Sequence, residues 1–232
     1  MTNEKLIAVL ETAKAEIASP HTYAQVEETI AALRAELAVK NAKAAGKQDL
    51  YKAMLAVIKN AKKESPSKRA LHGAWMDNGK QYVCDGRMLI ENGGTPLDLP
   101  TLPDDVERMN VQPIREARAR KEYPDVLTCP TLAELKSGIA EQKAQAKFQK
   151  VKIKSVDYHF GGGHRAKAEF LQIAVQATGS TTIHAENRKA GREKEYQVGE
   201  LWFESEDRTI RVLVLPIREY HDSTFTGFTY KD

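Results

Sequence analysis

The first 46 residues carry apolar side chains at helical spacing in two successive stripes. The first stripe consists of Leu6, Leu10, Ala13 and Ile17, and the second of Val26, Ile30, Leu33 and Leu37. Steps of three and four residues place each set on one side of a helix, and Ser19-Pro20 separates the two. The pattern predicts a helical hairpin or a short coiled-coil arm, which either packs on its own domain or dimerises.

A third helix is expected from about Asp49 to Lys63. Its apolar side chains share one face and are Leu50, Met54, Val57, Ile58 and Ala61. Lys52, Lys59 and Lys63 follow the spacing i, i+7 and i+11, which places them together on the opposite face. Such a row of lysines is either a binding surface for an anionic partner or a solvated helix face.

Three strands are expected after Pro66, within residues 70–90. The sequence Asp-Asn-Gly-Lys at 77–80 is typical of a hairpin turn between the first two strands. Asp85-Gly86 marks the turn before the third. Together with the lysine-bearing helix, these strands make a helix-plus-strands unit over residues 48–92.

The middle of the chain, residues 93–130, contains six prolines and little periodicity, which predicts a connector. A short helix is expected within it, around Gln112–Arg120.

Thr131 and Glu134 then have the spacing of a capping box. The helix that they open carries a second row of lysines, at positions 136, 143, 147 and 150.

The second half of the chain begins with alternation from Val151, which predicts a strand that ends at glycines 161–163. A helix is expected over residues 166–178, with Phe170 and Leu171 buried and Gln172 on its other face. Three closing strands are expected at 181–185, 199–204 and 209–216. Residues 219–232 show no usable pattern and are treated as a tail.

The two halves share one order of elements, although they share few residues. This weak internal repeat predicts an α+β fold, a single domain built from two helix-plus-antiparallel-sheet half-units. The domain is expected over residues 47–218, with half-units at about 48–92 and 150–218. The helical arm, residues 1–46, precedes it.

Composition narrows the classes of function. The 232 residues include 35 Lys+Arg and 32 Asp+Glu, and a formal net charge of +3 does not by itself identify a nucleic-acid binder. No run approaches the ~18 apolar residues of a membrane span. Cys84 and Cys129 are too few for a disulfide framework or a four-thiolate zinc site. We therefore expect a protein of the reducing cytoplasm without membrane contact, metal or cofactor.

Several motifs resemble those of bacterial-type DNA sliding clamps (DNA polymerase III beta subunits). The stretch from Gln81 to Ile90 is similar to a clamp strand that runs into Thr-Asp-Gly-His-Arg-Leu-Ala, with matches at Asp85, Gly86, Arg87 and Leu89. Here Cys84 replaces the threonine and the histidine is absent. Residues 168–171 resemble the start of a clamp helix. Residues 201–218 resemble the closing strand pair, with its apolar run followed by Pro, an apolar residue and Arg.

The resemblance implies a non-enzymatic protein that binds duplex DNA without sequence specificity through inward-facing helices. The matching positions are Lys52, Lys59 and Lys63 on the first helix and Arg165 and Gln172 at the second. It also implies action in DNA replication or a related process, replication proteins as partners, and self-association. A bacterial clamp subunit has three such domains and this chain has room for one, so a ring requires several copies. A phage origin is part of this expectation.

Two alternatives remain open. One is an interaction or scaffold protein that keeps the clamp fold without binding DNA. The other is an enzyme that handles an anion or a nucleotide at residues 161–165. There the amides of Gly162 and Gly163, with His164 and Arg165, would hold a phosphate at a helix N-terminus, although a turn before the helix is the simpler interpretation.

No catalytic or metal-ligating residue is assigned. Cys84 lies beside Asp85, but the sequence places no base near it, so a buried strand cysteine is expected. His159 and His164 flank the glycines without a carboxylate or cysteine cluster, and we expect them to be exposed turn residues.

Overall fold

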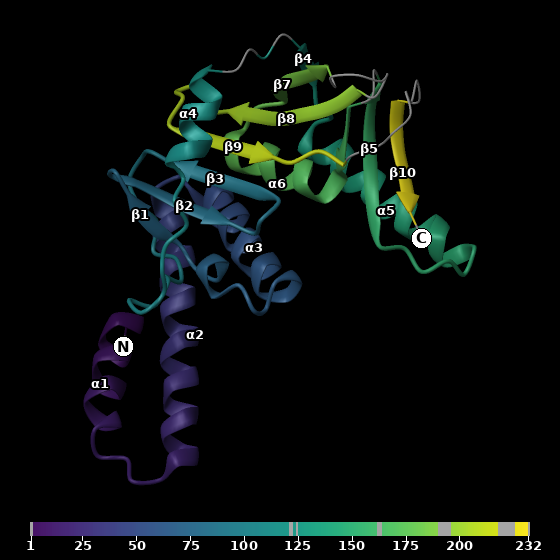
Figure 1. The fold of residues 1–232 in the computed structure, drawn as a ribbon. Helices are drawn as coiled ribbons and strands as arrows, with labels where there is room; N and C mark the ends of the chain where they lie inside the picture. Colours follow the sequence, from purple (N-terminus) through teal and green to yellow (C-terminus); the bar gives the residue numbers. More distant parts are fainter. Residues whose placement is uncertain are drawn as a thin grey trace.

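A helical arm projects from an α+β domain in the computed structural model, which describes residues 2–120, 123, 125–161, 164–189, 196–217 and 226–231 (Figure 1). The arm consists of α1 (Asn3–Lys14) and α2 (Pro20–Ala44), which lie side by side. Salt bridges join the two helices, Lys14 to Glu27 at 2.9 Å and Arg34 to Glu11 at 2.9 Å. The predicted helical hairpin is confirmed.

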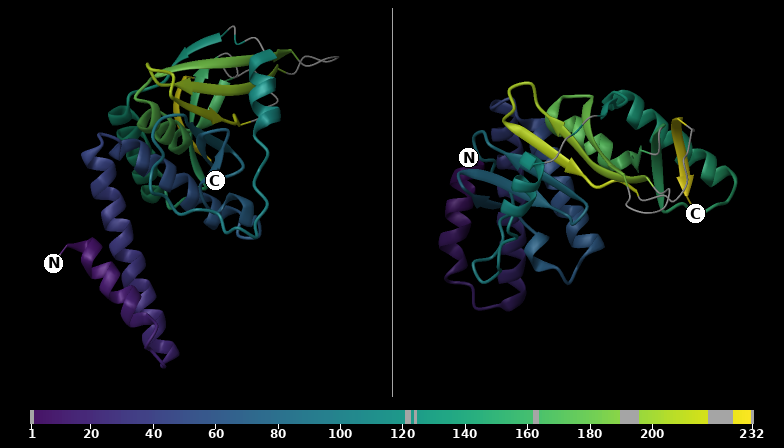
Figure 2. Two further views of the ribbon diagram at one scale, coloured as in Figure 1. Left: turned by 90° about the vertical axis from the view of Figure 1, so that its left-hand side faces the viewer. Right: turned by 45° about the horizontal axis from the view of Figure 1, so that its top comes forward.

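The arm meets the domain at its base. Helix α1 buries none of its residues, whereas Ala38 and Ala42, near the end of α2, join the main hydrophobic core. Figure 2 shows the same projection from two further directions. The hairpin therefore packs on itself and does not fold back over the domain.

A seven-stranded antiparallel sheet forms the centre of the domain, in the order β1-β2-β3-β9-β8-β7-β4. Its strands are β1 (Trp75–Asp77), β2 (Lys80–Cys84), β3 (Met88–Asn92), β4 (Asp125–Thr128), β7 (Thr182–Lys189), β8 (Tyr196–Glu204) and β9 (Ile210–Val214).

The internal repeat is visible in this sheet. Helix α3 (Gln48–Glu64) precedes β1, β2 and β3, and α6 (Ala168–Thr178) precedes β7, β8 and β9. The last strands of the two units pair antiparallel, with Ile90 opposite Val212, and α3 contacts α6. Two units with the same order of elements therefore meet at β3 and β9, and the predicted α+β fold is confirmed.

Residues along each strand point alternately to the two faces of the sheet, and both faces are covered by other parts of the chain. Ile90, Val212 and Phe203 point to the helices and pack with side chains such as Met54 and Leu171. Leu89, Leu213 and Trp202 point to the other face, where the proline-rich connector and α4 (Gln112–Arg120) cover them with Leu102, Val111 and Ile114. The connector is thus part of the core, and its helix has the predicted bounds.

The Asp85-Gly86 pair forms the turn between β2 and β3. The Asp85 carboxylate accepts hydrogen bonds from the backbone N–H groups of Arg87 at 2.9 Å and Met88 at 2.8 Å. Gly86 has φ 87°, a backbone conformation that strains any residue with a Cβ. This geometry explains why an aspartate followed by a glycine stands at this point of the sequence.

A second, three-stranded sheet has the order β10-β5-β6, with β5 (Ser155–Gly161), β6 (His164–Lys167) and β10 (Thr226–Lys231). Strand β5 begins four residues later than the alternation from Val151 predicted. Residues 226–231 of the expected tail form β10 and pair with β5. Helix α5 (Leu132–Phe148) starts at the predicted capping box of Thr131 and Glu134 and packs against this sheet.

His159 is buried, contrary to the sequence-based expectation, and it makes a hydrogen bond of 3.1 Å to Thr229 on β10. Burial lowers the pKa of this imidazole and the Arg165 charge lowers it further, while Asp157 acts in the opposite direction. The folded chain therefore keeps His159 neutral at pH values where the unfolded chain protonates it.

We expect the free energy of unfolding to fall as the pH drops below about 6.5, because the unfolded state then binds more protons at His159. Urea unfolding of the wild type and of His159→Gln between about pH 7.5 and pH 5 measures this contribution. The wild type should lose more stability over the interval than the variant. Equal losses would contradict the assignment.

Candidate nucleic-acid interface

The exposed face of α3 carries four lysines. Lys52, Lys59, Lys62 and Lys63 are all exposed, whereas Met54, Val57 and Ala61 on the other side of the helix are fully buried. The positions 52, 59 and 63 fall within about 40° of one another around the helix axis. In the part of the chain that the structure describes, no carboxylate forms a salt bridge with any of these three lysines. Helix α3 therefore presents an unpaired cationic row to solvent.

Helix α6 lies between α3 and α5 in this layer, in contact with both. Its Gln176 donates a hydrogen bond of 3.2 Å to Asp49 on α3, and its Glu169 forms a salt bridge of 3.1 Å with Lys143 on α5. Gln172, predicted for the interface, lies between these two positions along α6 and is half-buried. The structure thus brings Gln172 and the α3 lysines to the same helical layer.

A second row of lysines lies on α5. Lys136, Lys143 and Lys147 repeat the spacing i, i+7 and i+11 and are exposed. The salt bridge from Lys143 to Glu169 shows that this row borders the α6 side of the helix. The sequence revealed the row itself, but it gave no sign that α5 lies in the same layer as α3. We call these six residues the lysine face: Lys52, Lys59, Lys63, Lys136, Lys143 and Lys147.

Arg165, predicted as a DNA or anion contact, does not belong to the lysine face. It lies on β6 and is only 6% exposed. Its guanidinium donates two hydrogen bonds to the Asp157 carboxylate, from Nε at 3.2 Å and from Nη2. Asp157 is 1% exposed. The pair joins β5 to β6 inside the protein, so Arg165 is not placed to meet a ligand at the surface.

The residues of the predicted anion site also have a different setting. Gly162 and Gly163 lie outside the described residues. His164 opens β6, is buried and contacts the Asp125 carboxylate at 3.0 Å. Residues 161 and 164 belong to the paired strands β5 and β6, and α6 starts only at Ala168. Helix α6 thus begins two residues later than the predicted helix over 166–178, and residues 164 and 165 belong to a strand, so they do not lie at a helix N-terminus.

Cys84 has the environment of a core residue, as expected. Cys84 is only 5% exposed, and this burial raises the pKa of its thiol to about 11. The thiolate that a nucleophile requires is therefore scarce at neutral pH. Cys129 is also buried, and burial raises its pKa to about 12.

Within the described residues, no three His, Cys, Asp or Glu side chains gather closely enough to hold a metal ion. No described helix combines the length and the apolar character needed to cross a bilayer.

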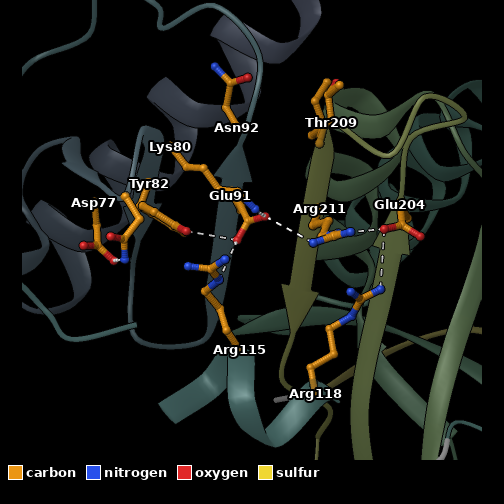
Figure 3. A network of polar contacts seen from close by, with 12 residues as sticks. Asp77, Lys80, Tyr82, Glu91, Asn92, Arg115, Arg118, Glu204, Thr209 and Arg211 are labelled. Atoms are coloured by element: carbon orange, nitrogen blue, oxygen red, sulfur yellow. Dashed lines mark hydrogen bonds and ion pairs between the residues drawn. The ribbon is translucent and has the colours of Figure 1, made fainter. Parts of the chain in front are cut away.

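The face of the sheet opposite the helices holds a polar network (Figure 3). The strand register aligns Tyr82, Glu91, Arg211 and Glu204 in one row across β2, β3, β9 and β8. Arg211 donates to Glu204 at 2.7 Å and contacts Glu91 at 3.5 Å, while Lys80 donates to Glu91 at 2.5 Å. Burial acts to raise the pKa of Glu91, but the Lys80 hydrogen bond and charge outweigh it and leave that pKa below its usual range.

Solved structures with a similar fold include two of the Helicobacter pylori beta clamp. One is bound to a DNA ligase peptide, with 12% identity over 73% of this chain and 62% of the clamp chain and a TM-score of 0.45. The other is in complex with 3,4-difluorobenzamide, with 14% identity, coverage of 74% and 63%, and a TM-score of 0.42. The chain thus spans under two thirds of the clamps' own length. No family model and no curated protein matches it.

Both similar structures belong to the family of clamps that the sequence resemblance named. What the two clamps bind is a property of those proteins.

Proposed function

We propose that this protein is a non-enzymatic, clamp-like DNA-binding protein that holds duplex DNA against the lysine face. The observation that carries the proposal is the row of exposed, unpaired lysines on α3. Lysine ammonium groups bind phosphate oxygens as point charges and release condensed counterions from the duplex. Such contacts act on the DNA backbone and carry no sequence information.

The neighbouring elements support this orientation. Helix α5 adds a second row of lysines with the same spacing, and α6 between them contributes the amide groups of Gln172 and Gln176. Glu169, the acidic residue of α6 on this layer, is already paired with Lys143. Two cationic rows flanking a nearly neutral helix fit the two phosphate backbones that border a groove of duplex DNA.

The size of the chain bears on how DNA would be retained. One clamp-like domain does not surround a duplex, so retention as a ring needs self-association of several copies. The proposal places the protein in DNA replication or a related process, with replication proteins as partners. Arg165 is left out of the proposed interface because its guanidinium is buried on Asp157.

Binding to two unrelated duplexes tests the proposal. Fluorescence anisotropy with labelled duplexes of about 30 base pairs, at about 50 mM salt, should give the same dissociation constant for both sequences within about twofold. Unlabelled duplex of either sequence should compete equally. If neither duplex binds at this salt concentration, the interaction or scaffold alternative replaces the DNA-binding proposal.

A further inference from the structure

A cavity of about 680 Å³ lies on the outer face of the sheet, opposite the lysine face. Helix α4 forms one wall with Arg115 and Arg118, and the strands contribute Glu91, Glu204 and Arg211. Arg208, in the turn between β8 and β9, completes a set of four arginines that line it. These residues come from three distant parts of the chain.

Three of the four guanidinium groups make no hydrogen bond within the part of the chain that the structure describes. The contact of Arg115 with Glu91 is 3.8 Å and that of Arg118 with Glu204 is 3.6 Å, both too long for hydrogen bonds. Arg208 is exposed, and its side chain bonds to none of the described residues. The N–H donors of these three side chains are therefore free to bind a ligand.

The charges around the cavity leave a surplus of positive charge. Glu91 and Glu204 are neutralised by Lys80 and Arg211, to which they are hydrogen-bonded. The remaining carboxylate in the lining, Glu116, accepts a hydrogen bond of 3.0 Å from Gln112. Its single negative charge is fewer than the three positive charges of Arg115, Arg118 and Arg208. An occupant that supplies carboxylate or other oxyanion groups would balance this surplus.

We propose that this cavity binds an acidic peptide segment of a partner protein, whose carboxylates accept hydrogen bonds from Arg115, Arg118 and Arg208. A planar guanidinium binds both oxygens of a carboxylate at once, which suits Arg over Lys at such a site. The volume accommodates a few side chains and excludes a duplex.

A nucleotide fits this cavity less well than a peptide. Arg118 lies over the ring of Trp202 at 4.9 Å and so covers the aromatic face on which a base would stack. Since the cavity and the lysine face lie on opposite sides of the sheet, this site is independent of the proposed DNA binding.

The test uses the full chain and a fluorescein-labelled hexapeptide of alternating Glu and Asp, followed by anisotropy at about 20 mM salt. The peptide should bind the wild type, and Arg115→Gln/Arg118→Gln should weaken binding about tenfold or more, because each variant side chain loses its charge-assisted hydrogen bonds. Arg208→Gln gives a second measurement that leaves the fold unchanged, since that side chain is exposed and bonds to none of the described residues. It should weaken binding too.

Lys52→Gln/Lys59→Gln is the matched control, because it removes the same charge from the opposite face and should leave peptide binding unchanged. Absence of peptide binding to the wild type would overturn the proposal, and so would equal losses in the control and the arginine variants. ATP that displaces the peptide at a lower concentration than unlabelled peptide does would reassign the cavity to phosphate and also overturn it.

Discussion

Replacing Lys52, Lys59 and Lys63 together with glutamate is expected to weaken duplex binding about a hundredfold or more at about 50 mM salt. The variant loses three phosphate contacts and places three carboxylates against the DNA backbone, where they repel it. Each of the three side chains is exposed and forms no salt bridge with the described residues, so the fold should be unaffected. Anisotropy with a labelled duplex measures the change.

The matched control is Lys5→Glu/Lys40→Glu/Lys43→Glu. These three exposed lysines lie on the arm, and their reversal changes the net charge by the same amount. We expect the control to bind duplex within about threefold of the wild type, since it alters only the distant field of the protein. Equal weakening in both variants would mean that total charge, and not the lysine face, determines binding.

Asp157→Ala is expected to lower the free energy of unfolding by about 3–5 kcal/mol, because the buried Arg165 guanidinium loses the carboxylate that accepts hydrogen bonds from its Nε and Nη2. Both residues are more than nine-tenths buried, and their hydrogen bonds join β5 to β6. For a chain of this size, the loss corresponds to a melting temperature lower by about 6–20 °C. Urea or thermal unfolding followed by circular dichroism measures it.

The double variant Asp157→Leu/Arg165→Met separates the loss of the pair from the loss of packing. It replaces both charged groups by apolar ones, and such exchanges of buried ion pairs are often neutral or stabilising. We expect it to recover most of the stability that Asp157→Ala loses. A wild-type-like Asp157→Ala variant would show that Arg165 is not confined to this pair.

Local sequence signals gave accurate predictions where a single segment determines its own structure. The stripes of the arm, the capping box at Thr131 and Glu134, and the short helix Gln112–Arg120 needed no information from distant residues. Each of these three features depends on spacing within a few residues. The internal repeat was predicted from the order of such local elements in the two halves of the chain.

The errors arose where strand pairing overrides local preference. Residues 164–167 precede a helix and include Ala166, yet they form β6 because β5 offers hydrogen-bonding partners to their backbone. Residues 226–231 alternate too weakly to be recognised, but they pair with the other edge of β5. Pairing between segments 70 residues apart leaves little trace in either segment alone.

The candidate sites divide in the same way. The row of Lys52, Lys59 and Lys63 could be predicted from the sequence because all three residues lie on one helix and their spacing places them on one face. The place of α5 beside α6, and the meeting of Arg115, Arg118 and Arg208 around one cavity, depend on how the sheet folds. Arg165 was misassigned because its partner Asp157 lies across a strand pair that the sequence did not reveal.

The salt dependence of duplex affinity tests the central claim most directly. Association constants measured between about 50 and 200 mM salt should give a log–log slope against salt concentration of about −0.9 for each phosphate contacted, and hence about −2.7 or steeper if the three α3 lysines all contact phosphates. The slope of Lys52→Glu/Lys59→Glu/Lys63→Glu should be shallower by about that amount, where binding is still measurable. A wild-type slope near zero, or an unchanged slope in the variant, would contradict the assignment of the lysine face to DNA.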